Sequence, residues 1–158
     1  DESIAILVPH IELIVDFSNI VLRLNGAAQW LPVMNRYGKH DFENLNSHLS
    51  KNNIPIMYIG QGFGSLESAD ISNKIILMTY HSSKGLDFDH VYLPMLGTEI
   101  SLPMAKIETL LFVAISRSKY NLMISYSGSL YLPMRKFVQG KTPFEIDKAS
   151  SATNKIII

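Results

Sequence analysis

The feature that most limits the possible folds is a series of short apolar runs, each ended by a turn signal. Ile4–Val8 ends at Pro9, and Ile54–Ile59 ends at the glycine-rich turn GQGFG. Runs that are apolar at consecutive positions are typical of strands buried on both faces. On this basis strands are predicted at Ile4–Val8, Ile54–Ile59, Lys74–Tyr80, His90–Met95 and Asn121–Ser127.

Apolar residues at helical spacing separate these strands. One helix is predicted from Leu13 to Leu24, where Asn25-Gly26 supplies a stop. Asp41 is a candidate cap for a second helix, which ends near Asn52. A third helix, at residues 107–115, is apolar almost all round and is therefore expected to be deeply packed.

Strands that alternate with helices predict right-handed βαβ units and an α/β fold. The expected architecture is a three-layer parallel sheet with helices on both faces. In such sheets, binding and catalysis gather in loops at the carboxyl ends of strands. This directs attention to the segments that follow Ile59, Tyr80 and Met95.

Composition narrows the functional classes. The chain has 158 residues, which suits one domain, and its 14 basic residues balance its 14 acidic ones. Any contact with nucleic acid must therefore be local. There is no cysteine, so disulfides and thiolate metal sites are excluded, and the five histidines have no metal-binding spacing. No metal site is expected.

The sequence also bears on location. It has no apolar run long enough to span a membrane and no signal-peptide pattern, so no membrane contact is expected. The lack of cysteine fits a reducing compartment, and a cytoplasmic location is predicted. The chain opens at Asp1, and a strand follows almost at once. We expect it to be a piece of a longer polypeptide.

A polar turn after the third predicted strand carries the first functional signal. Residues 78–89 read MTYHSSKGLDFD, which combines hydroxyls, an imidazole, an ammonium group, a glycine and carboxylates. Hydroxyls and backbone N–H groups can bind phosphate oxygens, and a carboxylate can accept from a ribose hydroxyl. Composition alone is equally compatible with an ordinary connection at the surface.

The order of residues favours the functional interpretation. TYHSSKGLDF, followed by the apolar HVYLPM, resembles motif V of UvrD-like helicases. The general form of that motif is Thr-x-His-x-x-Lys-Gly-Leu-Glu-Phe. The one departure within it is Asp87, which replaces the usual glutamate and is one methylene shorter. A shorter side chain is expected to reach a ribose hydroxyl less well.

A second segment resembles motif VI of the same family. Residues 110–119 read LLFVAISRSK, and the general form is Leu-x-Tyr-Val-Ala-Leu-Thr-Arg-Ala-Lys. Ser116 replaces the threonine and Ser118 the alanine, and both are mild changes. Without the resemblance, Arg117 would be read as a cation at the end of a helix, where the helix dipole favours it.

Together the two motifs resemble the second RecA-like motor domain of a UvrD/Rep-type superfamily 1 DNA helicase. This resemblance implies that Arg117 is catalytic and reaches the γ-phosphate of ATP as an arginine finger. It implies that Gly85 and Asp87 face the nucleotide, with Lys84 beside them. Thr79, His81 and Ser82 are expected to lie towards single-stranded DNA. His81 has an alternative role as a turn residue bonded to the backbone.

The sequence contains no Walker A pattern. The resemblance implies that ATP and Mg²⁺ are bound mainly by an N-terminal RecA-like domain of the same polypeptide, and that this chain alone is inactive. The domain is predicted to span residues 1–149, with a tail at 150–158. The alternative function is a non-catalytic module, derived from the helicase fold, that binds nucleic acid or protein. A free-standing flavodoxin-like domain would explain neither motif.

One segment has no counterpart in the family pattern. Residues 22–40 are read as an insertion or an extra helix, without an assigned function. Trp30 and Tyr37 could stack on a base, but packing is the more ordinary role for both.

Overall fold

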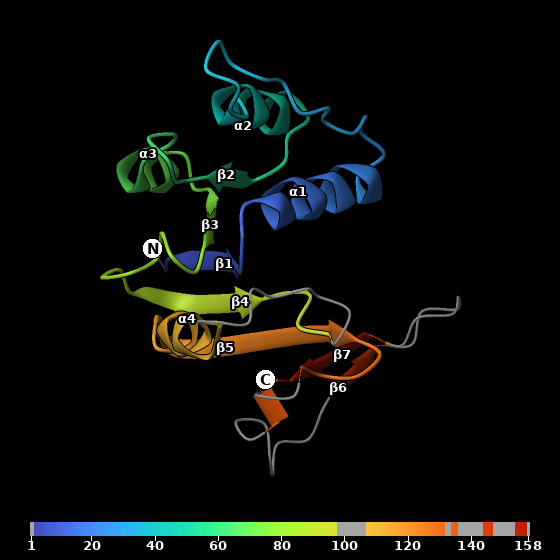
Figure 1. Ribbon diagram of the computed structural model, residues 1–158, viewed down its shortest axis with the longest axis vertical. Helices are drawn as coiled ribbons and strands as arrows, with labels where there is room; N and C mark the ends of the chain where they lie inside the picture. The colour runs from blue at the N-terminus through green and yellow to red at the C-terminus, as the bar shows by residue number, and fades with distance from the viewer. Residues whose placement is uncertain (1, 98–106, 132–133, 136–143, 147–153, 158) are drawn as a thin grey trace.

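A computed structural model describes residues 2–97, 107–131, 134–135, 144–146 and 154–157 (Figure 1). Within these ranges, strands of one sheet follow the order β2-β3-β1-β4-β5-β7-β6. The strands are β1 (Ile4–Val8), β2 (Ile56–Tyr58), β3 (Ile75–Thr79), β4 (Phe88–Leu93), β5 (Ser118–Ser127), β6 (Phe144–Ile146) and β7 (Asn154–Ile157). The helices are α1 (Glu12–Leu24), α2 (Phe42–Lys51), α3 (Leu66–Ile71) and α4 (Ile107–Ile115).

The strands from β2 to β5 in this order are all parallel. Each corresponds to a strand predicted from an apolar run, which confirms the predicted parallel sheet. Beyond β5 the sheet changes direction, because β7 pairs antiparallel with β5 and β6 pairs antiparallel with β7. The predicted tail therefore includes a strand at Asn154–Ile157, whereas 150–153 and 158 lie outside the described residues.

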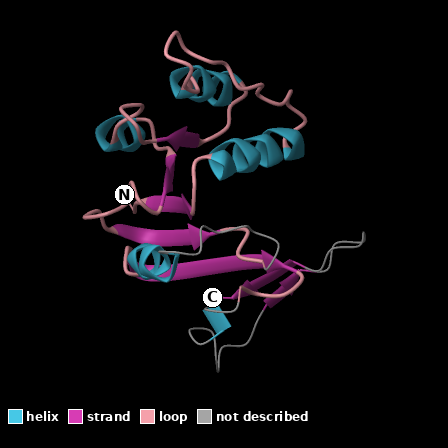
Figure 2. Cartoon of the chain, viewed as in Figure 1, coloured by secondary structure: helices cyan, strands magenta, loops and turns pink. Residues whose placement is uncertain are grey.

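Alternate residues of the central strand face two different apolar clusters. Ala5 and Leu7 of β1 belong to the cluster that includes residues of α3 and α4. Ile6 and Val8 belong to the cluster that includes residues of α1 and α2. Because successive side chains of a strand point to opposite faces, the two helix pairs cover opposite faces of the sheet (Figure 2). The structure has the three-layer α/β architecture that a RecA-like domain implies.

Local signals in the sequence account for the helix ends. Asp41 caps α2 as predicted, since its side chain accepts a hydrogen bond from Asn44 N at 3.2 Å. The predicted stop after α1 is also present, because Asn25 follows Leu24 as the C-terminal cap. Ser65 caps α3 by accepting from Ser68 N. This short helix was not predicted.

The expectation that α4 is deeply packed is wrong for part of its surface. Leu111 and Ala114 are buried in the core, but the side chain of Phe112 is 55% exposed. The reason is geometric, because α4 covers the sheet with one side only.

A carboxylate ties the N-terminal segment to β4. Asp89 Oδ2 accepts hydrogen bonds from Ser3 N at 2.8 Å and from Ser3 Oγ at 2.9 Å. Lys119 Nζ lies 3.6 Å from the other carboxylate oxygen. The hydrogen bond from the Ser3 backbone N–H is the main reason why the pKa of Asp89 is lowered. The Ser3 hydroxyl and the positive charge of Lys119 lower this pKa further. The ionised form is therefore favoured in the folded state.

This lowered pKa predicts a specific loss of stability in acid. A carboxyl whose pKa is lower when folded stabilises the fold above its unfolded pKa of about 3.9, and the effect is lost as pH falls through the folded pKa. Asp89→Asn should be less stable than wild type at pH 7, and the difference should shrink between about pH 5 and pH 2. Urea unfolding of both chains across this range measures it. A difference that does not change with pH would contradict this role of Asp89.

Candidate nucleotide and nucleic-acid contacts

Arg117 lies where α4 ends and β5 begins. Its backbone N–H donates to Ala114 O at 3.2 Å, and its carbonyl accepts from Phe88 N at 2.8 Å. Phe88 is the first residue of β4. Arg117 therefore lies at the amino edge of the sheet, where β4 and β5 start. This edge lies opposite the carboxyl ends to which the sequence directed attention, and a functional role of Arg117 stays a prediction.

The guanidinium of Arg117 is held by the chain around it. Nε donates to Val113 O at 3.0 Å, and Nη2 donates to Ser116 Oγ at 3.0 Å. Nη1 donates to Leu86 O at 2.8 Å and to Asp87 Oδ1 at 3.3 Å. These hydrogen bonds fix the direction of a planar group that has five N–H donors. The motif V and motif VI segments thus meet at this side chain.

The turn between Thr79 and Asp87 carries the chain from the carboxyl edge back to the amino edge. Ser83 N donates to Thr79 O, and Leu86 N donates to Ser83 O, both at 3.1 Å. Ser83 is fully buried, and its hydroxyl donates to Tyr80 O at 2.9 Å. Gly85 has φ +78°, and a Cβ placed there would meet nothing within 4 Å. Glycine is needed here for its backbone conformation rather than for space.

The predicted nucleotide-facing residues are accessible at this turn. Lys84 and Gly85 are exposed, and the side chain of Asp87 is 57% exposed. Asp87 makes an ion pair with Arg117, whose side chain is 20% exposed. Of the predicted set, the structure brings Asp87 and Arg117 into direct contact. Lys84 and Gly85 lie in the same turn without such a contact among the hydrogen bonds of the described residues.

The predicted nucleic-acid residues lie at the opposite edge. Thr79 Oγ1 and Ser82 Oγ are 2.9 Å apart, and Ser82 N donates to Thr79 Oγ1 at 3.2 Å. His81 between them in sequence is exposed. Thr79 is the last residue of β3, so these groups lie at the carboxyl edge. This is one of the strand ends to which the sequence directed attention, and contact of these groups with nucleic acid stays a prediction.

Tyr58 and Gly60, to which the sequence assigned no role, complete this carboxyl edge. A Cβ placed on Gly60 would lie 2.7 Å from Tyr58 Oη and 3.3 Å from Ser82 Oγ. The Tyr58 side chain is fully buried, and burial raises its pKa to about 12. Its hydroxyl has no hydrogen-bond partner among the described residues. The strand-end position of Tyr58, just before the glycine turn, is the signal that could have found them.

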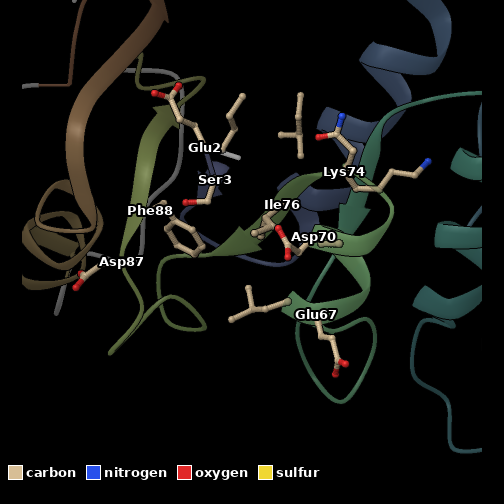
Figure 3. Close-up of a pocket in the computed structure, with 13 residues that line it drawn as sticks. Glu2, Ser3, Glu67, Asp70, Lys74, Ile76, Asp87 and Phe88 are labelled. Carbon is tan, nitrogen blue, oxygen red and sulfur yellow. The ribbon is translucent and has the colours of Figure 1, made fainter.

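A cavity of about 370 Å³ opens beside the amino edge, between α3 and the starts of β1, β3 and β4. Its lining includes Glu2, Glu67, Asp70 and Asp87, with Lys74 as the basic member. Figure 3 shows Asp87 at the margin, set apart from Glu67 and Asp70. An acidic lining disfavours phosphate, and Arg117 is not part of it. The candidate site for a phosphate group is therefore the surface around Arg117, beside Asp87, and not this cavity.

The part of the chain that the structure describes has neither a metal cluster nor a membrane-spanning helix. No group of three or more histidine, aspartate or glutamate side chains in it is arranged to hold a metal ion. Among the helices described there, none has the length and apolarity to cross a membrane.

A family match covers the part of the chain that holds both motif segments. A parallel α/β sheet with helices on both faces carries an arginine, at its amino edge, that is bonded to the turn after β3. Residues 63–129 match the family described as the UvrD-like helicase C-terminal domain. Both the motif V segment (78–89) and the motif VI segment (110–119) fall within this match. The match covers 67 of the 158 residues, and over this stretch the chain is similar to that family.

One solved structure aligns with most of this chain. The C-terminal domain of a possible DNA helicase from Lactobacillus plantarum WCFS1 aligns with a TM-score of 0.41 and 19% sequence identity, over 85% of this chain and 79% of that chain. No curated protein matches the sequence.

The conformation of Gly85 predicts the effect of a substitution. Gly85→Ala should destabilise the fold by about 1–2 kcal/mol, because a side chain disfavours positive φ although the space is open. Urea unfolding measures the change. Lys84→Ala, at the exposed neighbouring position, is the control and should stay within about 0.5 kcal/mol of wild type. Equal stability of the two variants would mean that the turn does not require glycine.

Proposed function

We propose that this domain supplies the arginine finger, and part of the single-stranded DNA track, of an ATP-dependent DNA helicase or translocase. The observation that carries the proposal is the contact between Arg117 and the turn at Leu86 and Asp87. It brings the motif V and motif VI segments, which are about 30 residues apart in sequence, to one accessible edge of the sheet.

The contacts of Arg117 suit a role with an incoming phosphate. The bonds to Val113 O and Leu86 O orient the guanidinium, and a pre-oriented cation loses little entropy when it meets an anion. The pair with Asp87 is long and partly exposed, and such pairs contribute only about 0–1 kcal/mol. A multiply charged phosphate would therefore replace Asp87 at small cost. The displaced carboxylate would be available for a ribose hydroxyl.

A guanidinium is the appropriate group for phosphoryl transfer. It stays charged at physiological pH, and its donors match the oxygens over which negative charge spreads in the transition state. Arginine fingers generally raise the rate of turnover by about 10³–10⁵-fold. Arg117 would have to raise the rate of ATP turnover by a factor in this range.

The remaining nucleotide contacts are assigned to another domain. The sequence has no Walker A pattern, and the described residues offer no cluster for Mg²⁺. We assign the binding of the ATP phosphates and of Mg²⁺ to an N-terminal RecA-like domain of the same polypeptide. Arg117, Gly85 and Asp87 would face that domain, with Lys84 beside them. A cytoplasmic location stays a prediction.

The DNA contacts are assigned to the opposite edge. Thr79 and Ser82 offer hydroxyls, and His81 offers an exposed imidazole, all of which can donate to phosphate oxygens. The segment from Thr79 to Phe88 joins this edge to the nucleotide edge. When the two domains close on ATP, this domain would move as one body and carry its DNA contacts with it.

A non-catalytic binding module is the competing function, and one observation favours it. The hydrogen bonds of Arg117 within the domain are enough to explain its presence as a structural residue. The two functions differ in what happens when Arg117 is removed from the complete polypeptide, since only an arginine finger affects ATP turnover.

Arg117→Ala in the full-length protein should lower DNA-stimulated ATP turnover by about 10³-fold or more. ATP binding, measured with a fluorescent nucleotide, should change by only a few-fold, because the other domain supplies most contacts. Arg117→Lys should also fail, since an ammonium group cannot reproduce the planar donor set.

Lys119→Ala is the matched control, because it removes a nearby cation that pairs with Asp89 instead. It should retain turnover close to wild type, and thermal melting should confirm that each variant is folded. Turnover of Arg117→Ala within a few-fold of wild type would refute the arginine-finger role and favour the binding module.

A further inference from the structure

The stretch from Phe17 in α1 to His40 before α2 has an unusual charge distribution. The residues between Asp16 and Asp41 include Arg23, Arg36 and Lys39 but no aspartate or glutamate. The whole chain, by contrast, has as many acidic as basic residues. A local excess of positive charge in a neutral chain indicates a surface that attracts anions.

This segment contains a small ordered hairpin at residues 31–41, hereafter the basic hairpin. Asn35 N donates to Lys39 O at 2.7 Å, and Gly38 N donates to Asn35 O at 3.0 Å, which closes the turn. The Asn35 side-chain oxygen also accepts from Tyr37 N and Lys39 N. At the base, Asp41 N donates to Val33 O at 2.7 Å. The backbone of the hairpin is therefore fixed by its own hydrogen bonds.

Trp30 anchors the basic hairpin to the domain. Its side chain is 3% exposed, and its ring N–H donates to Asn44 Oδ1 on α2 at 2.8 Å. Its backbone N–H and carbonyl both bond the side chain of Asn19 on α1. The ring also stacks against Phe42. Trp30 is thus a packing residue, which was the more ordinary of the two roles considered from the sequence. Its bonds to Asn19 and Asn44 attach the start of the hairpin to α1 and α2.

The tip of the basic hairpin presents an aromatic ring and cations to solvent. Tyr37 is 70% exposed, and the Arg36 guanidinium carbon lies 4.7 Å from its ring centroid. Arg36 and Lys39 are exposed. Exposed apolar side chains that gather in one place often mark an interaction site, whereas single ones are common on any surface. The hairpin carries several of them: Leu31, Val33 and Met34, in addition to Tyr37.

The base of the hairpin is connected to the carboxyl edge of the sheet. Phe42, which follows the hairpin, lies with its ring 4.4 Å from Tyr58 and 6.0 Å from Phe63. Tyr58 ends β2 beside Gly60, which in turn lies next to Ser82. A continuous set of contacts therefore leads from the hairpin to the edge assigned to DNA. Figure 1 shows the hairpin as the cyan loop that projects beyond α2.

We infer that the basic hairpin is a second contact for single-stranded DNA, which extends the track beyond Thr79 and Ser82. Single-stranded nucleic acid is bound by cations that follow the backbone and by aromatic rings on which bases stack. Arg36 and Lys39 supply the cations, and Tyr37 supplies the ring. This inference rests on the proposed function, because it assumes that the carboxyl edge binds DNA.

The test uses the full-length protein and fluorescein-labelled oligo(dT), with binding measured by anisotropy in the absence of nucleotide. Tyr37→Ala should weaken binding by about 5- to 150-fold, the range expected for loss of one stacked base. Arg36→Ala with Lys39→Ala should weaken binding and flatten its salt dependence by about 0.7 in slope for each lost phosphate contact.

Tyr120→Ala is the matched control. Tyr120 is 71% exposed, almost the same as Tyr37, but it lies near the start of β5 at the other edge of the sheet. It should bind oligo(dT) as wild type does. Because both tyrosines are exposed, neither variant should change the melting temperature appreciably.

The outcomes separate the two claims. If wild-type protein binds oligo(dT), and Tyr37→Ala binds within two-fold of wild type, the hairpin contact is refuted and the proposed function stands. If wild-type protein does not bind oligo(dT) at all, the proposed DNA track is refuted and the hairpin contact with it. Selective weakening by Tyr37→Ala, with Tyr120→Ala unaffected, would support both.

Discussion

The hydrogen bond from Arg117 Nη1 to the Leu86 carbonyl is the interaction on which the functional account depends. It joins the end of α4 to the turn that precedes β4, and the backbone bond from Phe88 N to Arg117 O reinforces the same junction. A backbone carbonyl is a neutral acceptor, so it directs the guanidinium without cancelling its charge. The weaker pair with Asp87 is the part that an anion can displace. The site thus combines a fixed orientation with a replaceable partner.

The two proposed sets of contact groups lie at opposite edges of the sheet, and one segment of the chain, from Thr79 to Phe88, connects them. Arg117 and Asp87 lie at the amino edge, and Thr79 and Ser82 lie at the carboxyl edge. Parallel strands require a connection that returns along the whole length of the sheet, and the turn after β3 is that connection. Its buried Ser83 holds it against the core. In the proposed function, this connection would carry movement at the nucleotide edge to the DNA edge without any change in the fold.

The sequence predicted the strands well because their residues are apolar at consecutive positions, as burial on two faces demands. It did not predict α3, because a six-residue helix with only Ala69 buried has too little periodicity to detect. The motifs predicted that Asp87 and Arg117 lie at the same nucleotide site. They did not predict that this site is at the amino edge of the sheet, because that depends on how the chain returns from the end of β3 to the start of β4. The carbonyls of Leu86 and Val113 could not be predicted as partners, because every residue has a carbonyl. The exposure of Tyr37, likewise, depends on the Trp30 anchor and on the turn at Asn35.

A structure of the full-length protein with a transition-state mimic such as ADP and aluminium fluoride tests the central claim most directly. The account predicts that the Arg117 guanidinium keeps its bond to Leu86 O, leaves Asp87, and lies within hydrogen-bond distance of the fluoride. A guanidinium that still pairs with Asp87 and lies beyond reach of the mimic would contradict it.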